Sequence, residues 1–352
     1  MEKRRVAAIT NDGKFTVIEE NIPELKKGEV LVEVKASLIS PGTELGCIAL
    51  PLRKNPKPHA KPRKFGYSNA GIVIKQGPGC EDIPIGMRVA CMGGGYALHT
   101  DYAVIPRNLM VPIPDGMSFE VASFAHLGAT SLHALRRAQL QIGENVLILG
   151  LGIIGQIATQ ICVASNLHVA VIDKLPMRIE LAKRVGAEPL MISPDDKEEE
   201  IVNRAKKFTR GYGMDCAIIS FGGDATEVMK LIVKMMKVAP DTHPMGRIVI
   251  VGVANFQTYN WPVSMGNIDV RASSRPGPGY HDYLYEHGQD YPPVFVQWTT
   301  KRNMEEVLRM EEEGRINLKM LITHSIPFTD FAKGAEALIS SPNEALGVII
   351  LY

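Results

Sequence analysis

The spacing of apolar and polar residues changes near residue 118. Before it, short apolar segments are separated by glycine- and proline-rich turns, and residues 29–39 (EVLVEVKASLI) alternate apolar and polar side chains as a half-buried strand does. The first 115 or so residues therefore predict a compact β-rich domain. From Ser118, a candidate N-cap with Glu120 in the first turn, apolar residues follow a helical spacing to Leu140.

Strand and helix patterns then alternate. Helices are predicted at 155–165 and 176–187, and the apolar strands are 145–150, 167–173, 215–223 and 246–253. Apolar strands separated by helices are typical of a parallel, doubly wound α/β sheet. An acidic helix is predicted at 303–315. The β-like tail ending in LGVIILY resembles the first domain, and we expect it to fold back onto that domain.

Composition narrows the class of protein. A chain of 352 residues suits two domains, and 45% hydrophobic with 22% charged residues is ordinary for a globular enzyme. A net charge of +1 gives no general attraction to nucleic acid or to an anionic membrane. The five cysteines form no CxxC pair, the N-terminal MEKRRVAAIT has no apolar signal-peptide core, and no apolar run reaches membrane-spanning length. We expect a cytoplasmic protein with a reduced set of thiols.

A glycine-rich turn follows the strand at 145–150. Gly150, Gly152 and Gly155 have GxGxxG spacing, which is weak by itself, but here it follows an apolar strand and opens a helix. Gly150 permits a tight turn, Gly152 allows a pyrophosphate to approach the backbone, and Gly155 allows close helix packing. With Ile154, these residues form the predicted phosphate-binding loop of a dinucleotide. The other interpretation is that the glycines only form a turn.

The cofactor preference depends on Asp173, at the end of the next strand. A carboxylate there binds a ribose diol and repels a 2′-phosphate, which favours NAD over NADP. Lys174 and Arg178 lie close by in sequence, and either could contact a phosphate instead. It is also possible that Asp173 only caps a loop. We predict NAD as the cofactor.

The whole chain resembles the medium-chain dehydrogenase/reductase superfamily. The motifs that carry the resemblance are EVLVEVKASLIS, GYSNAGIVIKQGPG, YAVIPRNLMVPIPDGMSFEVASF, GENVLILGLGIIG and IELAKRVGAE. The resemblance implies a GroES-like β-rich catalytic domain at 1–127, a Rossmann domain at 128–300, and a return to the catalytic domain at 301–352. It also implies an active site in the cleft between the domains, and a homodimer or homotetramer. Shorter matches, such as GYSNAG, resemble the dehydrogenase half of bacterial bi-domain oxidoreductases.

Zinc-dependent members of that superfamily hold a catalytic metal with three ligands. By resemblance, the ligand positions fall on Ser40, Tyr67 and His126, and Glu44 stands where the family has an aspartate. Serine and tyrosine are poor zinc ligands, and the four cysteines of the family's structural zinc lobe are missing. We therefore expect no catalytic zinc. His126 binding a metal together with ligands from outside the protein stays open.

Without zinc, a hydrogen-bonding acid and base must act on the substrate oxygen. We expect Tyr67 to donate to that oxygen, His126 to relay the proton because its ordinary pKa is near neutrality, Ser40 to bridge, and Glu44 to orient the others. The plain alternatives are that Tyr67 packs at a strand start and that His126 is a core residue. His99 and His133 are interpreted as background.

Further candidate contacts come from two sources. By resemblance, Thr130 lines the nicotinamide, and Val253, the last residue of the predicted strand at 246–253, is a further candidate cofactor contact. The unusual segment 271–302 supplies possible substrate contacts or a subunit interface: Arg275, Tyr280 and Trp298. The loop before Tyr67 is basic, and it is either a solvated loop or a lid for an anionic substrate. Its cations are Arg53, Lys54, Lys57, Lys61, Arg63 and Lys64.

These features predict a zinc-independent dehydrogenase that uses NAD to oxidise a secondary alcohol of a polyol, cyclitol, sugar or sugar acid. Two alternatives stay open. One is an NAD(P)H-dependent enoyl or quinone reductase, as in other zinc-free branches of the superfamily, although Asp173 disfavours NADPH. The other is a redox sensor that binds NAD(H) without turnover.

Overall fold

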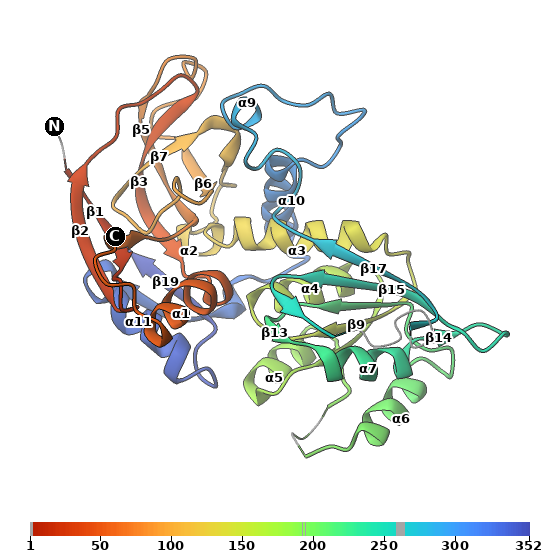
Figure 1. The fold of residues 1–352 in the computed structure, drawn as a ribbon. Coiled ribbons are helices and arrows are strands. Elements are labelled where there is room, and N and C mark those ends of the chain that lie inside the picture. Colours follow the sequence, from red (N-terminus) through yellow and green to blue (C-terminus); the bar gives the residue numbers. More distant parts are fainter. Residues whose placement is uncertain (1–2, 192, 194, 258–264) are drawn as a thin grey trace. The chain divides into compact units, whose positions relative to one another are not determined.

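The computed structural model describes residues 3–191, 193, 195–257 and 265–352. It divides into two compact units (Figure 1): unit 1 contains Met1–Ala129 and Pro276–Tyr352, and unit 2 contains Thr130–Arg275. Residues 276–300, which the sequence analysis assigns to the Rossmann domain, belong to unit 1. Among the helices of the described residues, none is both long and apolar enough to cross a membrane.

Unit 1 is built on β-sheets. The larger sheet has the order β18-β19-β3-β5-β6-β8, with β7 also paired to β3, and the smaller has the order β2-β1-β4. The strands of the two sheets are β1 (Lys3–Ile9), β2 (Phe15–Asn21), β3 (Glu29–Leu38), β4 (Arg63–Lys64), β5 (Ser68–Gln76), β6 (Arg88–Met92), β7 (Tyr102–Pro106), β8 (Met110–Pro112), β18 (Ile322–Pro327) and β19 (Gly347–Leu351). The C-terminal β19 pairs antiparallel with β3, so the end of the chain completes the sheet that its beginning forms.

Strand β3 is more deeply buried than its sequence indicates. Its alternating pattern predicted a half-buried strand, but most of its residues are buried, and Glu33 and Lys35 are only partly exposed. The prediction was wrong because β3 pairs with β5, β7 and β19, which makes it a central strand. Strand β3 therefore holds the residues that follow it, from Ile39 onward, against the core.

The helices of unit 1 include a break that the sequence did not predict. The helical pattern at 118–140 forms two helices, because the chain turns at Ser123 and Phe124. Ser118 is the N-cap as predicted, and its side chain accepts a hydrogen bond from Val121 N. The helical elements are η1, a π-helix (Pro41–Ala49), α1 (Leu50–Lys54), η2 (Arg107–Leu109), α2 (Phe119–Ala122), α3 (Ala125–Ala138, shared with unit 2), α9 (Tyr283–Glu286), α10 (Thr300–Glu312), η3 (Lys319–Leu321), η4 (Phe328–Asp330) and α11 (Phe331–Ser340).

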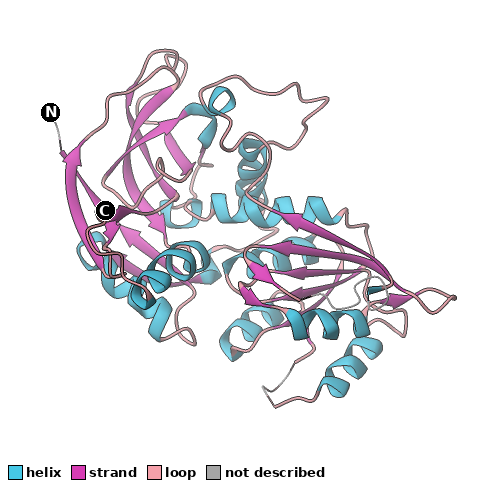
Figure 2. Ribbon diagram, in the orientation of Figure 1, coloured by secondary structure: helices cyan, strands magenta, loops and turns pink. Residues whose placement is uncertain are grey.

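Unit 2 has the predicted parallel sheet, seen as neighbouring arrows flanked by helices in Figure 2. The strand order is β11-β10-β9-β12-β15-β14, with β17 paired to β15. Among the described strand pairs of this sheet, only β14–β15 is antiparallel. The strands are β9 (Asn145–Leu149), β10 (His168–Ile172), β11 (Glu188–Pro189), β12 (Cys216–Ile219), β14 (Lys237–Val238), β15 (Pro244–Val251) and β17 (Asn267–Ser273), and a small pair is formed by β13 (Gly223–Asp224) and β16 (Ala254–Asn255).

Helices pack against this sheet, and apolar side chains from helices and strands together form a hydrophobic core. Ile201 and Ala205 of α6 and Ile232 of α7 are buried in one cluster with strand residues such as Leu147 and Ile219. The helices are α4 (Ile153–Ala164), α5 (Pro176–Arg184), α6 (Glu198–Phe208) and α7 (Thr226–Met235). The predicted order of strand, glycine turn, helix and strand is confirmed, and it places the glycine turn at the carboxyl end of β9.

Candidate active site

The first part of the site lies where β3 ends. Ser40 precedes the π-helix η1, and its backbone oxygen accepts a hydrogen bond from Glu44 N (3.0 Å). The Glu44 side chain turns back, so that its Oε2 accepts from Ser40 N (3.0 Å). Glu44 is only 1% exposed, and its Oε1 has no hydrogen-bond partner. A buried carboxylate therefore holds the backbone at Ser40.

Tyr67 lies just before β5, and its side chain reaches Ser40. Its hydroxyl donates a hydrogen bond to Ser40 Oγ, although the two residues come from different segments. Gly66 makes this path possible, because its φ is +112° and a Cβ there would lie 2.3 Å from His99 N. Tyr67 is therefore held with its hydroxyl against Ser40, the residue before η1. Its position is that of a site residue as well as of a residue at the start of a strand.

His126 stands beside Tyr67 from the first turn of α3. Its Nδ1–H donates to the backbone oxygen of Tyr67 (2.7 Å), and the two ring centroids are 4.7 Å apart in an edge-on arrangement. Because a carbonyl oxygen only accepts, Nδ1 carries the hydrogen, and in the neutral ring Nε2 carries the lone pair. The structure thus brings Ser40, Glu44, Tyr67 and His126 together.

The surroundings keep both rings neutral. Burial lowers the pKa of His126 to about 4, although the hydrogen bond to Tyr67 O opposes this shift. The expectation that His126 titrates near neutrality is therefore wrong, because burial disfavours the imidazolium. Burial also raises the pKa of Tyr67, and the charge of Glu44 raises it further. At neutral pH the site presents a phenol and an imidazole, and neither ring is charged.

Tyr280, a predicted substrate contact, lies beside this group. Its ring centroid is 6.0 Å from that of His126, and its hydroxyl accepts from Gly94 N (2.7 Å). Trp298 is partly buried just before α10, and Arg275 is exposed with φ +67° at the last residue of unit 2. Tyr280 therefore joins the site in unit 1.

His99 is a functional candidate that the sequence analysis assigned to the background. It is fully buried, its Nε2 donates to Glu44 Oε2 (3.1 Å), and its Nδ1 hydrogen-bonds Ser37 Oγ (2.8 Å). Ser37 Oγ in turn is 2.9 Å from the hydroxyl of Tyr352. Residue spacing gives no signal for this chain of contacts, because its members come from three distant segments, around Ser37 and Glu44, at His99 and at Tyr352.

The glycine turn of unit 2 has the geometry of an anion-binding loop. Gly150 has φ +85°, and a Cβ on Gly155 would lie 1.9 Å from Gly150 O, so both positions need glycine. A Cβ on Gly152 would meet nothing within 4 Å, which leaves the backbone open to a ligand. Helix α4 begins at Ile153 without a side-chain cap, so its first amide groups are left for an anion. The loop fits the pyrophosphate of a dinucleotide.

Asp173 is tied to this loop. Its carboxylate accepts from Leu151 N (2.5 Å) and Leu175 N (2.8 Å), and Arg178 lies 4.0 Å from its Oδ2. The contacts in the structure are those of a residue that closes the loop, which was the alternative interpretation. Arg178 Nε is buried without a hydrogen-bond partner, and Lys174 is exposed.

The remaining predicted cofactor contacts occupy different places in unit 2. Ile154 is partly buried in the first turn of α4, and its backbone oxygen accepts from Ser131 Oγ (3.0 Å). Thr130 is partly buried in α3, and Val253 is 59% exposed just after β15, beyond the carboxyl end of that strand.

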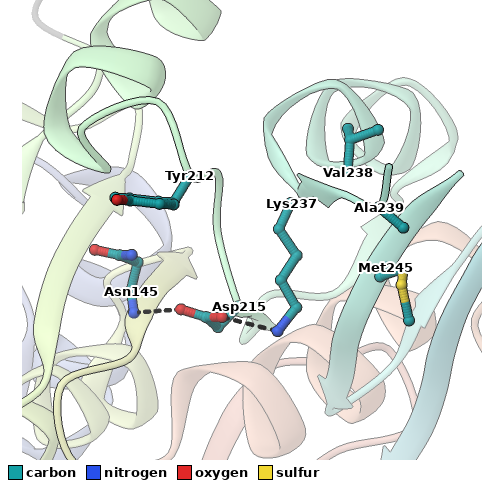
Figure 3. A pocket seen from close by; sticks show the side chains of 7 residues that line it. All are labelled: Asn145, Tyr212, Asp215, Lys237, Val238, Ala239 and Met245. Atoms are coloured by element: carbon teal, nitrogen blue, oxygen red, sulfur yellow. Dashed lines mark hydrogen bonds and ion pairs between the residues drawn. The ribbon is translucent and has the colours of Figure 1, made fainter. Parts of the chain in front are cut away.

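One pocket of about 390 Å³ lies at the amino ends of strands of the same sheet (Figure 3). Asp215 lies in it between two partners, accepting from Asn145 N (2.9 Å) and from Lys237 Nζ (2.9 Å). The other lining residues are Tyr212, Val238, Ala239 and Met245. It borders the amino ends of β9, β12 and β15, whereas ligands of parallel α/β sheets bind at the carboxyl ends. This pocket is therefore separate from the glycine loop.

Comparison with known proteins shows which proteins this chain is similar to. Residues 154–284 match the zinc-binding dehydrogenase family. An (R,R)-butanediol dehydrogenase of Neisseria gonorrhoeae is 24% identical over 98% of this chain and 99% of its own, and a sorbitol dehydrogenase of Bacillus subtilis is 24% identical over 99% and 97%. Over almost its whole length the chain is therefore similar to polyol dehydrogenases. A protein of Escherichia coli that is described as a short chain alcohol dehydrogenase and was solved with NADH has the same fold, with a TM-score of 0.77 at 18% identity over 100% of both chains.

The zinc ligands of the superfamily's zinc-type members can be tested against these residues. The three positions hold two hydroxyls, which bind each other, and one imidazole whose Nδ1 binds a backbone oxygen. Zinc prefers thiolate, imidazole and carboxylate ligands. Within the residues that the structure describes, no group of three His, Cys, Asp or Glu could hold a metal ion. The residues at these positions do not fit a catalytic zinc site.

Proposed function

We propose that this oxidoreductase of the alcohol dehydrogenase type oxidises a secondary alcohol, or reduces the ketone, with NAD(H) and without a catalytic metal. The observation that carries the proposal is the contact of Tyr67 with both other former ligand positions: its hydroxyl with Ser40 Oγ, and its backbone oxygen with His126 Nδ1. The positions that hold a metal in zinc-type relatives thus form a hydrogen-bonded acid–base group.

The reaction has to move a hydride and a proton. In oxidation, the carbinol C–H bond breaks with its electron pair, the O–H bond gives its electron pair to the new C=O bond, and the proton leaves the oxygen. When bound, the nicotinamide supplies the hydride acceptor. The protein has to bind the oxygen and conduct its proton, which is the task that we assign to Tyr67, His126 and Ser40.

Hydrogen bonding, rather than ionic charge, polarises the substrate oxygen in this proposal. The Tyr67 hydroxyl donates a hydrogen bond to the substrate oxygen. In the absence of substrate, the same hydroxyl donates to Ser40 Oγ. His126 is neutral because burial lowers its pKa to about 4. It accepts the alcohol proton on Nε2 and releases it from the same nitrogen to water, since its Nδ1–H is bound to the backbone oxygen of Tyr67. Tyr280, whose ring lies beside His126, is assigned a contact with the substrate.

The substrate class is a polyol, cyclitol, sugar or sugar acid. The relatives named for butanediol and sorbitol support a hydroxylated substrate, as do the hydroxyls of Ser40, Tyr67 and Tyr280. An acidic substrate receives less support from the basic loop, because Arg53 binds Glu336 and Lys64 binds Glu20. Arg275 and Trp298 are also proposed to contact the substrate.

NAD is the proposed cofactor, bound at Gly150, Gly152, Ile154 and Gly155. The carboxylate of Asp173 supports this choice because it would repel a 2′-phosphate, while Arg178 and Lys174 reduce that repulsion. Titrations with NADH and NADPH test the choice. NADH is expected to bind at least tenfold more tightly, and a preference for NADPH would contradict the proposal.

We also propose a cytoplasmic homodimer or homotetramer. Its five cysteines are free, as a reducing compartment allows, and the segment after α9 exposes Val294 and Phe295 at 86% and 85%. Light scattering of the purified protein gives its mass in solution, and a monomer would contradict this part of the proposal.

The direct test of the chemistry is the variant Tyr67→Phe. With NAD⁺ and a panel of alcohols that includes 2,3-butanediol and sorbitol, we expect kcat to fall by about 10²-fold or more while the Kd for NADH is unchanged. Tyr212→Phe, at an exposed tyrosine of unit 2, is the matched control. An unchanged kcat in Tyr67→Phe would remove Tyr67 from the mechanism. No turnover of any alcohol by the wild type would favour the redox sensor, and turnover of enones or quinones would favour the reductase.

A further inference from the structure

The paired hydroxyls of Ser40 and Tyr67 belong to segments that no local structure joins. Ser40 follows β3, and Tyr67 lies 27 residues later, after the basic loop and before β5. A contact between such segments lasts only if a third element holds both. The described contacts around the pair identify one residue that binds both segments, and that residue is His99.

The backbone of His99 holds the Tyr67 segment. His99 N donates to Phe65 O (3.2 Å), and His99 O accepts from Ala7 N (2.9 Å) in β1. The Phe65 ring packs edge-on against the His99 imidazole with centroids 5.0 Å apart. Gly66 lies so close to His99 N that no side chain fits between them. The chain from Phe65 to Tyr67 is therefore fixed against His99.

The side chain of His99 holds the Ser40 segment through Glu44. A carboxylate oxygen only accepts, so His99 Nε2–H donates to Glu44 Oε2, the oxygen that also accepts from Ser40 N. On its other side, His99 Nδ1 binds the Ser37 hydroxyl, and Ser37 binds the hydroxyl of Tyr352. The imidazole is thus held at both nitrogens, with no freedom to rotate away from Glu44.

We propose that His99 is a positioning residue of the active site, which sets the contact between Tyr67 and Ser40 by binding one segment with its backbone and the other, through Glu44, with its imidazole. This inference rests on the proposed function, in which these hydroxyls act on the substrate oxygen. His99 itself is buried behind Glu44 and contacts neither hydroxyl of the pair in the described structure.

Two substitutions separate positioning from plain packing. In His99→Gln, the side-chain amide nitrogen reaches the place of Nε2 and can still donate to Glu44. In His99→Asn, it reaches only the place of Nδ1, so the contact with Ser37 is kept and Glu44 loses its donor. We expect kcat to fall about 10- to 100-fold in His99→Asn, because small displacements of reacting groups cost this much. We expect His99→Gln to stay within about fivefold of the wild type.

The measurements are kcat and KM for 2,3-butanediol with NAD⁺, the Kd for NADH, and crystal structures of both variants. Support requires that the Asn variant lose kcat with an unchanged Kd for NADH, and that its Tyr67–Ser40 contact be broken while the Gln variant keeps it. An intact contact in His99→Asn, or equal losses of kcat in both variants, would overturn the proposal.

Two further variants complete the test. If His99→Asn does not fold, Glu44→Leu removes the same link from the other side, and the crystal structure is read in the same way. Tyr67→Phe distinguishes the two levels of failure: if it loses kcat and His99→Asn does not, only the positioning role is wrong. If Tyr67→Phe keeps its kcat, the proposed function is wrong as well.

Discussion

The Tyr67 hydroxyl lies where an ionised phenol would be costly. Burial raises its pKa most, the charge of Glu44 adds to the shift, and hydrogen bonds with Ser40 and Thr43 oppose it. A phenol that keeps its proton is a lasting donor to a substrate oxygen, whereas a phenolate would repel the oxyanion formed in ketone reduction. The neutral state of Tyr67 is therefore compatible with both directions of the reaction.

His126 should leave a mark on the pH dependence of folding. Its pKa is about 4 in the folded chain against an ordinary 6.5, so as the pH falls below 6.5 the unfolded chain binds the proton first. The free energy of unfolding should therefore fall between pH 6.5 and about pH 4, by up to about 1.4 kcal/mol per pH unit from this one group. Above pH 6.5 the effect is absent.

The variant His126→Asn isolates this contribution, because asparagine can still donate to Tyr67 O but does not titrate. Urea unfolding of both proteins at pH 4.5, 5.5 and 7 measures it. The wild type should lose more stability than His126→Asn as the pH falls. Equal pH dependence in the two proteins would show that the imidazole is not buried in its neutral form.

At the residue scale, sequence and resemblance located the candidates but not their contacts. Ser40, Tyr67 and His126 could be named because they fall on known ligand positions, and the structure brings them together. His99 could not be found, because its role depends on Glu44, 55 residues away, and on the exact path of Phe65. The shifted pKa of His126 also depends on burial, which the sequence does not show.

At the scale of elements, the path of the chain into β5 depends on one glycine. An alanine at position 66 would adopt an unfavourable φ of +112° and place its Cβ 2.3 Å from His99 N. Gly66→Ala should therefore lower stability by at least about 2 kcal/mol and displace Tyr67, with loss of kcat.

The matched control is Gly95→Ala, which has a similar positive φ of +86° but nothing within 4 Å of its added Cβ. Thermal unfolding and kcat of the two variants separate backbone strain from the close contact. If Gly95→Ala loses as much stability and kcat as Gly66→Ala, the close approach to His99 is not the reason why position 66 needs glycine.

The turn before α4 allows a second test at this scale. Gly152 is open on its Cβ side, so Gly152→Ala should fold normally but place a methyl group where a pyrophosphate would approach. We expect NADH binding to weaken at least tenfold with no change in Tm of the free protein. Gly155→Ala should instead lower Tm, because its Cβ would lie 1.9 Å from Gly150 O. Unchanged NADH affinity in Gly152→Ala would place the cofactor elsewhere.

Elements were easier to predict than their surroundings. Apolar runs correctly gave β9, β10, β12 and β15 of unit 2, because a parallel strand covered on both faces needs apolar residues throughout. Strand β17 (Asn267–Ser273), whose residues are more polar, was not predicted. One continuous helix was predicted at 118–140. This prediction was wrong, because Ser123 Oγ donates to Glu120 O and the chain turns there. The burial of β3 was missed because its three partner strands come from distant parts of the sequence.

At the scale of the whole molecule, the division of labour follows the two units. Unit 2 carries the glycine loop on a parallel sheet, and unit 1 carries the hydroxyls and the imidazole on a β-rich frame. The C-terminal strand β19 joins that frame at β3, and Tyr352 reaches the His99 network through Ser37. Tyr352 therefore belongs to the hydrogen-bonded network of His99, which a domain assignment from sequence does not indicate.

The central claim is that ordinary side chains replace a metal at the reacting oxygen. The most direct measurement is the zinc content of the purified protein, by mass spectrometry of metals, alongside kcat before and after treatment with EDTA. The account predicts zinc far below one ion per chain and a kcat that EDTA does not change. One tightly bound zinc per chain, whose removal abolishes turnover and whose return restores it, would contradict the account.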